Sequence, residues 1–134
     1  GNQSFSCKGV LRGLHFQNPP YVQGKLMQVI SGSVLDVAVD IRKESATYGQ
    51  YFSIVLSGKN KKSLWLPPGF AHGFITLEDD TIFTYKCTGF YHKQSEGAII
   101  WNDKDLDINW GIERPNISEK DAIAPAFSQL QSEF

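Results

Sequence analysis

The sequence predicts an all-β fold, a sandwich or a barrel, and two observations carry this prediction. Short apolar runs of strand length follow one another closely, and Gly, Pro, Asn or Asp separates them. The chain also holds 12 Gly and 6 Pro, and 13% of its residues are aromatic, a composition that suits short strands joined by turns. At 134 residues, without repeats or linkers, the chain fits one domain over residues 1–134. The runs that we expect to form strands are residues 25–30, 34–40, 51–56, 63–66, 73–77, 81–87 and 98–101.

The clearest strand is expected at residues 34–40, where the side chains alternate. Residues 35, 37 and 39 are apolar and share one face, whereas Asp36 and Asp40 fall on the other. We therefore expect a strand with one apolar and one polar face. The Ser-Gly-Ser turn at residues 31–33 makes residues 25–30 the expected hairpin partner.

Only the C-terminal part of the chain indicates a helix. Ser118 is a suitable N-cap, and the acidic Asp121 follows three residues later. Taken alone, these two residues are a capping pair. Because Pro125 cannot continue a helix, we expect about one turn.

Charge and cysteine content argue against several function classes. With 13 Lys and Arg against 14 Asp and Glu, and no long run of like charge, the chain lacks the basic surface typical of proteins that bind nucleic acid or anionic membranes. An anionic ligand must therefore meet a local cationic pocket. No apolar stretch reaches the length of a membrane span, and residues 1–4 have no signal-peptide character. Cys7 and Cys87 lie far apart without metal-type spacing, which favours a reduced chain in the cytoplasm and leaves one disulfide as the alternative.

Polar side chains interrupt two apolar segments near the N-terminus. Arg12, His15 and Gln17 stand among apolar residues and glycines. Because buried polar groups need partners, they form either a satisfied structural network or a binding site. Lys25 shares a strand face with Met27, so its ammonium must meet a charge or a ligand unless the side chain reaches the rim.

Two further candidates lie later in the chain. The Pro-Pro-Gly turn at residues 67–69 fixes the backbone before His72 and delivers its imidazole to the start of a strand, although a turn-capping role is the alternative. Tyr85 falls on the strand face opposite Lys86, where a core or rim position is the ordinary interpretation. His92 has polar neighbours, and we expect it to lie in solvent without a role.

Seven sequence blocks, taken together and in order, resemble the dTDP-4-dehydrorhamnose 3,5-epimerase family across nearly the whole chain. The blocks are LRGLHxQ from Leu11, QGKL from Gln23, VLDVAVDIR from Val34, PPGFAHGF from Pro67, YK from Tyr85, WND from Trp101 and SEKD from Ser118. The resemblance implies a cupin-type jelly roll, a homodimer, and a nucleotide-diphosphate sugar with a ketone at C4 as the substrate. It implies no organic cofactor. Family members also carry a longer N-terminal segment with an arginine and a glutamate that grip the nucleotide diphosphate, and this chain begins inside that pattern.

The same resemblance implies roles for individual residues. His15 would be the general base, Asp121 would hold and polarise it, Tyr85 would be the acid on the opposite face of the sugar, and Lys25 would lie beside the ketone oxygen. The positions that match substrate contacts in the family are Arg12, His72, Glu96 and Lys120 for the sugar or diphosphate, Gln17, Asp36 and Tyr91 as nearby pocket residues, and Asn2 for the nucleotide.

These residue types suit an epimerisation. A C–H next to a ketone becomes removable only if the enolate oxygen is stabilised, and a fixed ammonium in a water-poor barrel can supply that. Imidazole titrates near neutral pH, and a carboxylate behind it holds the correct tautomer. An acid across the ring returns the proton to the other face and inverts the carbon. With the substrate that the resemblance implies, this chemistry predicts an isomerase of deoxysugar biosynthesis that inverts C3, C5 or both of a dTDP-4-keto-6-deoxyhexose.

Two other functions remain as alternatives on the sequence. A non-catalytic module that binds a nucleotide sugar or carbohydrate would keep the pocket without the missing nucleotide clamp. A metal-dependent cupin oxygenase would use a His-x-His pair, a carboxylate and a later His. Here the pair is His15-x-Gln17, and Lys25 would repel a cation, so we expect no metal.

Overall fold

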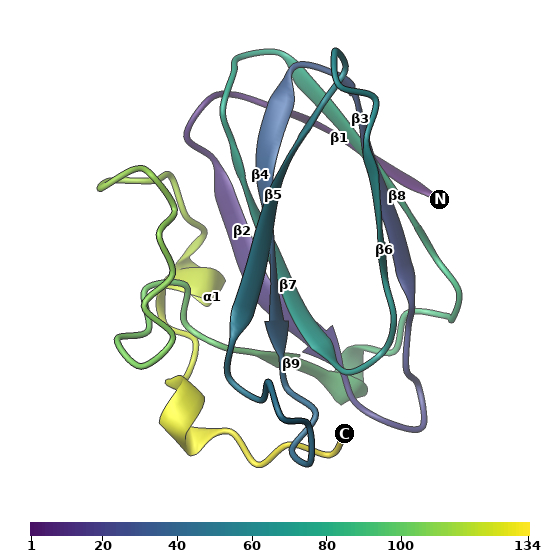
Figure 1. The fold of residues 1–134 in the computed structure, drawn as a ribbon, viewed down its shortest axis with the longest axis vertical. Helices are drawn as coiled ribbons and strands as arrows, with labels where there is room; N and C mark the ends of the chain where they lie inside the picture. Colours follow the sequence, from purple (N-terminus) through teal and green to yellow (C-terminus); the bar gives the residue numbers. More distant parts are fainter.

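Two antiparallel sheets face each other in the computed structural model, which describes all residues 1–134 (Figure 1). The four-stranded sheet has the order β1-β8-β3-β6, and the five-stranded sheet has the order β5-β4-β7-β2-β9. This arrangement is a jelly roll of the cupin type, so the predicted all-β class is confirmed. The strands are β1 (Asn2–Ser6), β2 (Leu11–Gln17), β3 (Lys25–Ser31), β4 (Ser33–Asp40), β5 (Tyr51–Ser57), β6 (Ser63–Leu66), β7 (Phe70–Thr76), β8 (Thr81–Cys87) and β9 (Glu96–Ala98).

One hydrophobic core lies between the two sheets. It holds eight buried residues, drawn from both sheets, and the rings of Phe74 and Phe83 stack in it with centroids 4.6 Å apart. Each of the larger side chains in this core contributes about 1.5–3 kcal/mol by leaving water. The members of this core are Met27, Val29, Val34, Ala38, Leu56, Leu66, Phe74 and Phe83.

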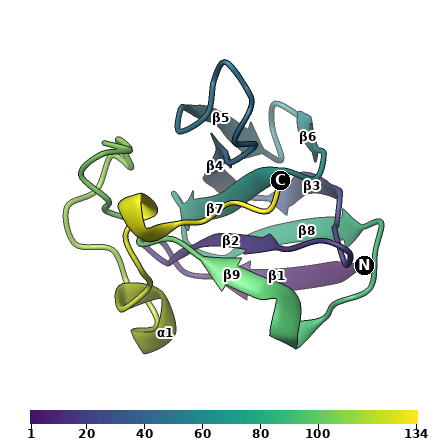
Figure 2. The same ribbon diagram turned by 90° about the horizontal axis from the view of Figure 1, so that it is seen from below.

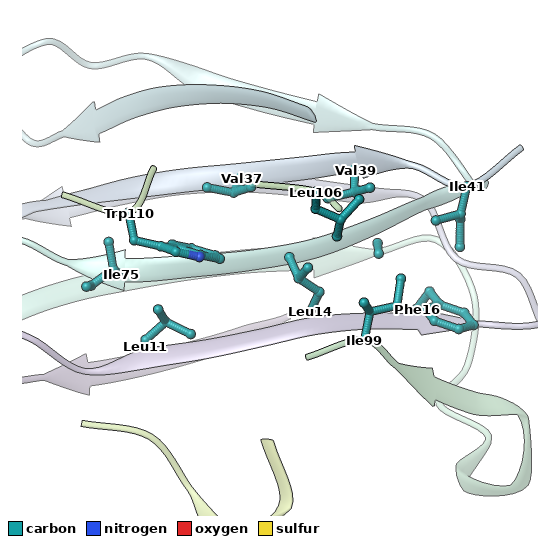
Figure 3. Packing of buried hydrophobic residues seen from close by; sticks show 11 residues of the cluster. Leu11, Leu14, Phe16, Val37, Val39, Ile41, Ile75, Ile99, Leu106 and Trp110 are labelled. Atoms are coloured by element: carbon teal, nitrogen blue, oxygen red, sulfur yellow. The ribbon is translucent and has the colours of Figure 1, made fainter. Parts of the chain in front are cut away.

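A second core covers the outer face of the five-stranded sheet. The chain after β9 folds back over this face, and Figure 3 shows Leu106 and Trp110 from that segment among side chains of β2, β4 and β7. The Trp110 indole N–H donates to the carbonyl of Trp101 over 2.9 Å, which holds the segment in place. Figure 2 shows the same C-terminal stretch running past β2 and β7 on one side of the molecule.

Strand β4 is consequently buried on both faces, which differs from the predicted polar face. Val37 and Val39 pack under the C-terminal segment, while Val34 and Ala38 point between the sheets. Asp36 and Asp40 are only 0% and 3% exposed. Their carboxylates are therefore buried groups that need partners, which places Asp36 among the site candidates.

The predicted hairpin between residues 25–30 and 34–40 is wrong. Strand β3 pairs with β6 and β8, whereas β4 pairs with β5 and β7. The chain changes sheets at Gly32, whose φ of +83° and close approach to Thr81 leave no room for a Cβ. The switch lets the apolar inner faces of β3 and β4 face each other across the barrel instead of lying side by side.

Other strand predictions differ from the structure in their bounds. The expected strand at residues 98–101 is replaced by β9, which ends at Ala98, because Ile99 and the residues after it turn into the outer core. Strand β7 begins at Phe70 rather than residue 73, and neither β1 nor β2 was among the predicted strands.

Helical structure is confined to short segments. They are α1 (Glu119–Ala122) and the 3₁₀ turns Lys93–Ser95 and Phe127–Gln129. Ser118 Oγ accepts the backbone N–H of Asp121 over 3.2 Å, so the predicted N-cap and single turn are confirmed. The structure contains no helix with the length and apolar character that crossing a bilayer requires.

Candidate active site

Three of the candidate residues meet in a hollow between the sheets. His15, Lys25 and Tyr85 line both a cavity of about 400 Å³ and an adjoining one of about 220 Å³. His15 comes from β2 of the five-stranded sheet, whereas Lys25 and Tyr85 come from β3 and β8 of the facing sheet. The hollow therefore has an imidazole on one wall and an ammonium and a phenol on the other.

An irregularity in β2 turns Arg12 and His15 toward the same side. In a regular strand, residues three apart point to opposite faces. The register against β7 shifts by one residue between Arg12, which pairs with Phe74, and His15, which pairs with His72. Such a bulge turns the side chains that follow it toward the other face of the strand. As a result, both Arg12 and His15 line the smaller cavity.

The bulge requires glycine at position 13. Gly13 has a φ of +119°, and a Cβ there would lie 2.6 Å from the Cα of Gly73 and 2.7 Å from the carbonyl of His72. Its backbone N–H donates to Oδ2 of Asp121 over 3.1 Å. The same residue thus shapes β2 and anchors the carboxylate behind His15.

Asp121 holds the His15 ring from behind. The Nε2–H of His15 donates to Oδ1 of Asp121 over 2.6 Å, and Asp121 is only 3% exposed. Because a carboxylate only accepts, this bond fixes the proton on Nε2 and leaves Nδ1 as the free acceptor of the ring. Asp121, whose backbone N–H donates to the Ser118 cap of α1, therefore also orients the imidazole through its side chain, so the capping interpretation and the site interpretation hold together.

A second histidine–carboxylate pair lies on the neighbouring strands. His72 Nε2 contacts Oδ1 of Asp36, and both side chains are buried. Oδ2 of Asp36 has no hydrogen-bond partner within the chain. His72 stands beside His15 in the β2–β7 register and lines the smaller cavity.

Lys25 carries an ammonium that no carboxylate neutralises by direct contact. Lys25 takes part in none of the ion pairs in the structure. Burial lowers the pKa of Lys25 below 10.5, while the charges of Cys87, Asp36 and Glu96 act in the opposite direction. Arg12 also lacks an ion-pair partner, so the hollow offers two cations to an anionic ligand.

Tyr85 keeps its proton over a wide pH range. Burial raises the pKa of Tyr85 above 10.0, the neighbouring Cys87 adds to this shift, and Arg12 opposes it. A phenol that stays protonated in the cavity wall can donate a proton to a developing carbanion.

Glu96 and Lys120 form a pair at the edge of the larger cavity. Lys120 Nζ donates to Oε1 of Glu96 over 2.6 Å and so links α1 to β9. Partial burial would raise the pKa of Glu96, but the hydrogen bonds from Lys120 and Tyr91 outweigh it and the net pKa is lowered. The same contact with Glu96 raises the pKa of the Tyr91 hydroxyl.

The structure brings the predicted site residues together, but the side chain of Gln17 is bound by the protein's own backbone. Asn2, Tyr91 and Glu96 line the larger cavity, Arg12 and His72 line the smaller one, and Asp121, Asp36 and Lys120 each contact one of these or His15. Gln17 also borders the larger cavity, but its amide is occupied by backbone groups.

The sequence interpretation missed three residues that line the larger cavity and misplaced His92. The three missed residues are Phe16, Gln23 and Cys87. Cys87 could have been found from strand alternation, because it lies two residues after Tyr85 on the same face of β8 and pairs with Lys25. Both cysteines are free thiols. His92, expected in solvent, is half-buried and stacks on Tyr21 with ring centroids 3.8 Å apart.

No group of three or more His, Cys, Asp and Glu side chains is placed to hold a metal ion. Each of the two cavity histidines is instead bound to a carboxylate through Nε2. The donor set therefore suits proton transfer, because both imidazoles are held by hydrogen bonds rather than aimed at a common point.

A jelly roll with an imidazole on one wall of its hollow and a phenol on the facing wall is suited to isomerisation by proton transfer. Comparison with known proteins agrees. The family model of dTDP-4-dehydrorhamnose 3,5-epimerase matches residues 1–129. The dTDP-4-dehydrorhamnose 3,5-epimerase of Shigella flexneri is 52% identical over 126 residues, which cover 94% of this chain and 70% of that protein.

Two solved structures are similar to this fold. The dTDP-4-dehydrorhamnose 3,5-epimerase of Elizabethkingia anophelis superposes with a TM-score of 0.93 at 48% identity, covering 95% of this chain and 71% of that one. The dTDP-6-deoxy-D-glucose-3,5-epimerase of Legionella pneumophila, solved with dTDP-4-keto-L-rhamnose, has a TM-score of 0.92 at 49% identity, covering 96% and 69%.

This chain belongs to the dTDP-4-dehydrorhamnose 3,5-epimerase family. The predicted family and enzyme class, an isomerase, are confirmed, and the non-catalytic binding module is not favoured. The chain spans about 70% of the length of the relatives from Shigella and Salmonella.

Proposed function

We propose that this chain acts, as one domain over residues 1–134, on a dTDP-4-keto-6-deoxyhexose and inverts C3, C5 or both. One observation carries the proposal: His15 and Tyr85 project from opposite sheets into a shared hollow. Inversion needs a base on one face of the sugar ring and an acid on the other. The ligand of the Legionella structure, dTDP-4-keto-L-rhamnose, supports the choice of substrate.

In the proposed reaction, Nδ1 of His15 removes the proton from the carbon beside the ketone. The C–H electron pair forms a double bond between C3 and C4 or between C4 and C5, and the π pair of the C4 carbonyl moves onto its oxygen, so an enolate forms. Asp121 stabilises the imidazolium that forms, because its carboxylate contacts Nε2 over 2.6 Å. A positioned base of this kind contributes about 10²–10⁴-fold to the rate.

Lys25 stabilises the enolate, and Tyr85 completes the inversion. The Lys25 ammonium is half-buried and without an ion pair, so its charge is available to the C4 oxygen in a site of low dielectric. Tyr85 then donates its phenolic proton to the carbon from the other face. The His15 imidazolium releases the abstracted proton to solvent, and solvent returns a proton to the Tyr85 phenolate, so both groups regain their starting state. The electron pair returns from oxygen to carbon, and the ketone is regenerated without a redox step.

The remaining cavity residues bind the substrate in this proposal. Arg12 has no acidic partner, which suits it to the diphosphate. His72, held by Asp36, faces the sugar from the smaller cavity. Lys120, Glu96 and Tyr91 lie at the cavity edge, and Asn2 is placed for the nucleotide.

Solvent exchange tests the reaction directly. The protein is incubated with dTDP-4-keto-6-deoxyglucose in D₂O, and deuterium is measured at C3 and C5 by NMR. Label at one or both carbons is expected, and its absence with folded protein refutes the enzyme. His15→Ala should abolish the exchange while dTDP binding, measured by calorimetry, stays within about threefold. An equal loss of both would make His15 a binding residue.

A matched pair of lysine variants controls for general effects of charge. Lys25→Met should abolish exchange, whereas Lys86→Met should retain it, because Lys86 is exposed on the opposite face of the adjacent strand β8. Loss of exchange in both variants would contradict the role of Lys25.

The assembly and location of the chain are also proposals. We propose a homodimer, which the exposed apolar side chains Phe5, Ile30 and Trp65 on the four-stranded sheet support. Sedimentation equilibrium checks it, and a monomer at all concentrations would refute it. The two free thiols support a reducing compartment such as the cytoplasm.

A further inference from the structure

Gln17 ends β2 at the border of the larger cavity, yet its amide group is used up within the protein. Gln17 is buried, with only 7% of its surface exposed. Its Nε2–H₂ donates to the backbone carbonyls of Tyr21 and Phe90, the latter over 2.9 Å. Its Oε1 accepts the backbone N–H of His92 over 3.0 Å. Both amide protons therefore have partners, and none remains for a ligand.

The three backbone groups belong to two loops that meet at the mouth of the hollow. Tyr21 lies in the loop from residue 18 to 24, and Phe90 and His92 lie in the loop from residue 88 to 95. The rings of Tyr21 and His92 stack, with centroids 3.8 Å apart and planes inclined by 14°. A second amide, that of Gln23, donates to the carbonyl of Gly89 over 3.0 Å.

Tyr91 is the residue between the two groups that Gln17 binds in the second loop. Its side chain lines the larger cavity although the residue is 63% exposed, so little packing holds it there. Gln17 fastens the backbone on both sides of Tyr91, and Gln17 itself pairs with Glu96 in the β2–β9 register. The position of Tyr91 thus depends on the bonds to its backbone and on the contact of its hydroxyl with Glu96, because its ring is largely exposed.

We propose that Gln17 is a positioning residue that fixes the Tyr91 loop at the mouth of the hollow and thereby sets the affinity for the sugar nucleotide. The effect of Gln17 on substrate affinity rests on the proposed function, whereas its effect on the loop does not. Gln17 touches no reacting atom. The bonds that it makes join an uncharged amide to uncharged backbone groups.

Limited proteolysis tests the effect on the loop without any substrate. Lys93 is exposed in the second loop and is a trypsin site. Gln17→Ala removes three hydrogen bonds, and the loop should open more often, so that cleavage after Lys93 is about tenfold faster than in the native chain. The control is Gln28→Ala, an exposed glutamine on β3, which should leave the rate unchanged. Equal cleavage rates in native, Gln17→Ala and Gln28→Ala proteins overturn the proposal.

A double-mutant cycle with Tyr91 tests the effect on substrate. Gln17→Ala should raise KM for the sugar nucleotide about tenfold and change kcat less than about threefold. In a Tyr91→Ala background the same substitution should leave KM unchanged, because there is no side chain left to position. Additive effects on KM would show that Gln17 acts on the substrate directly and would overturn the proposal.

A second variant keeps the test decisive if Gln17→Ala does not fold. Gln17→Glu preserves the volume and removes both donors, leaving a carboxylate against the carbonyls of Tyr21 and Phe90. It should show the same faster cleavage and the same rise in KM. If the Gln17 variants are cleaved faster but the native protein has no enzymatic activity, only the proposed function is refuted. If Gln17→Glu shows native cleavage and a native KM, the role of Gln17 is refuted.

Discussion

Replacing Asp121 by Asn removes one negative charge and leaves the shape of the side chain unchanged. In the native chain the carboxylate contacts His15 Nε2 over 2.6 Å and the Gly13 N–H over 3.1 Å. An asparagine that keeps its oxygen on Gly13 turns its NH₂ toward the imidazole. Nε2 must then accept a hydrogen bond from this NH₂, so the ring proton moves to Nδ1 and the base is lost from the cavity.

The size of the effect follows from the charge interaction that disappears. Two unit charges about 4 Å apart interact by about 4 kcal/mol at an effective dielectric constant of about 20, which is about 10³-fold in rate. His15 is 35% exposed, so water screens part of this energy. We therefore expect Asp121→Asn to lower kcat about 10²–10³-fold.

Deuterium exchange at C3 and C5 under saturating substrate measures this loss. The thermal midpoint should change by only a few degrees, because the amide fills the same space and still accepts the bond from Gly13. Asp105→Asn, at an exposed position, is the matched control and should exchange at the native rate. An exchange rate of Asp121→Asn within about threefold of native would refute the argument that this carboxylate fixes the tautomer of His15.

Three further outcomes follow from the structure. Activity should fall at alkaline pH with a midpoint below 10.5, because burial lowers the pKa of Lys25 and the ammonium becomes neutral as pH rises through that pKa. A pH profile of kcat/KM with no loss below pH 10.5 would contradict the role of Lys25. Lys25→Met should raise the thermal midpoint by a few degrees while it abolishes exchange, since a desolvated ammonium is replaced by an apolar chain, and a lowered midpoint would show that the ammonium is well solvated or paired. Asp40→Asn should destabilise the fold by about 2 kcal/mol in urea unfolding, because the carboxylate accepts bonds from Arg42, Ser45 and Thr47 that hold its pKa far below 3.8. That contribution is present above pH 3.8 and is lost as pH falls, so the native stability should drop in acid and the Asp40→Asn variant should show a smaller drop.

The strand pattern of the sequence predicted the fold class but not which strands are neighbours. Lys25 and Met27 were expected on one face of a strand, and both do point between the sheets. Their pairing with β6 and β8 could not be predicted, because hydrogen bonds between strands are made by backbone groups that every residue shares. The short turn at residues 31–33 looked like a hairpin and instead carries the chain from one sheet to the other.

The burial of β4 illustrates a second limit. Alternation of apolar residues with Asp36 and Asp40 predicted a polar face, which is usual when one side of a sheet meets solvent. In this chain the residues after β9 fold over one face and the facing sheet covers the other, so both aspartates are buried. Only the tertiary structure shows that Asp36 contacts His72 and that Asp40 accepts hydrogen bonds from Arg42 in the loop after β4.

By itself the sequence determined the all-β class, the single capped turn at Ser118, the family, and the residue types of the site, because these depend on side-chain periodicity and on local motifs. The tertiary structure decided how the site is assembled. A one-residue bulge at Gly13 turns Arg12 and His15 to one side, and Asp121 reaches His15 across more than a hundred residues of chain. Such contacts are set by how sheets and loops pack in three dimensions, and no local pattern in the chain encodes the distance between two groups so far apart in sequence.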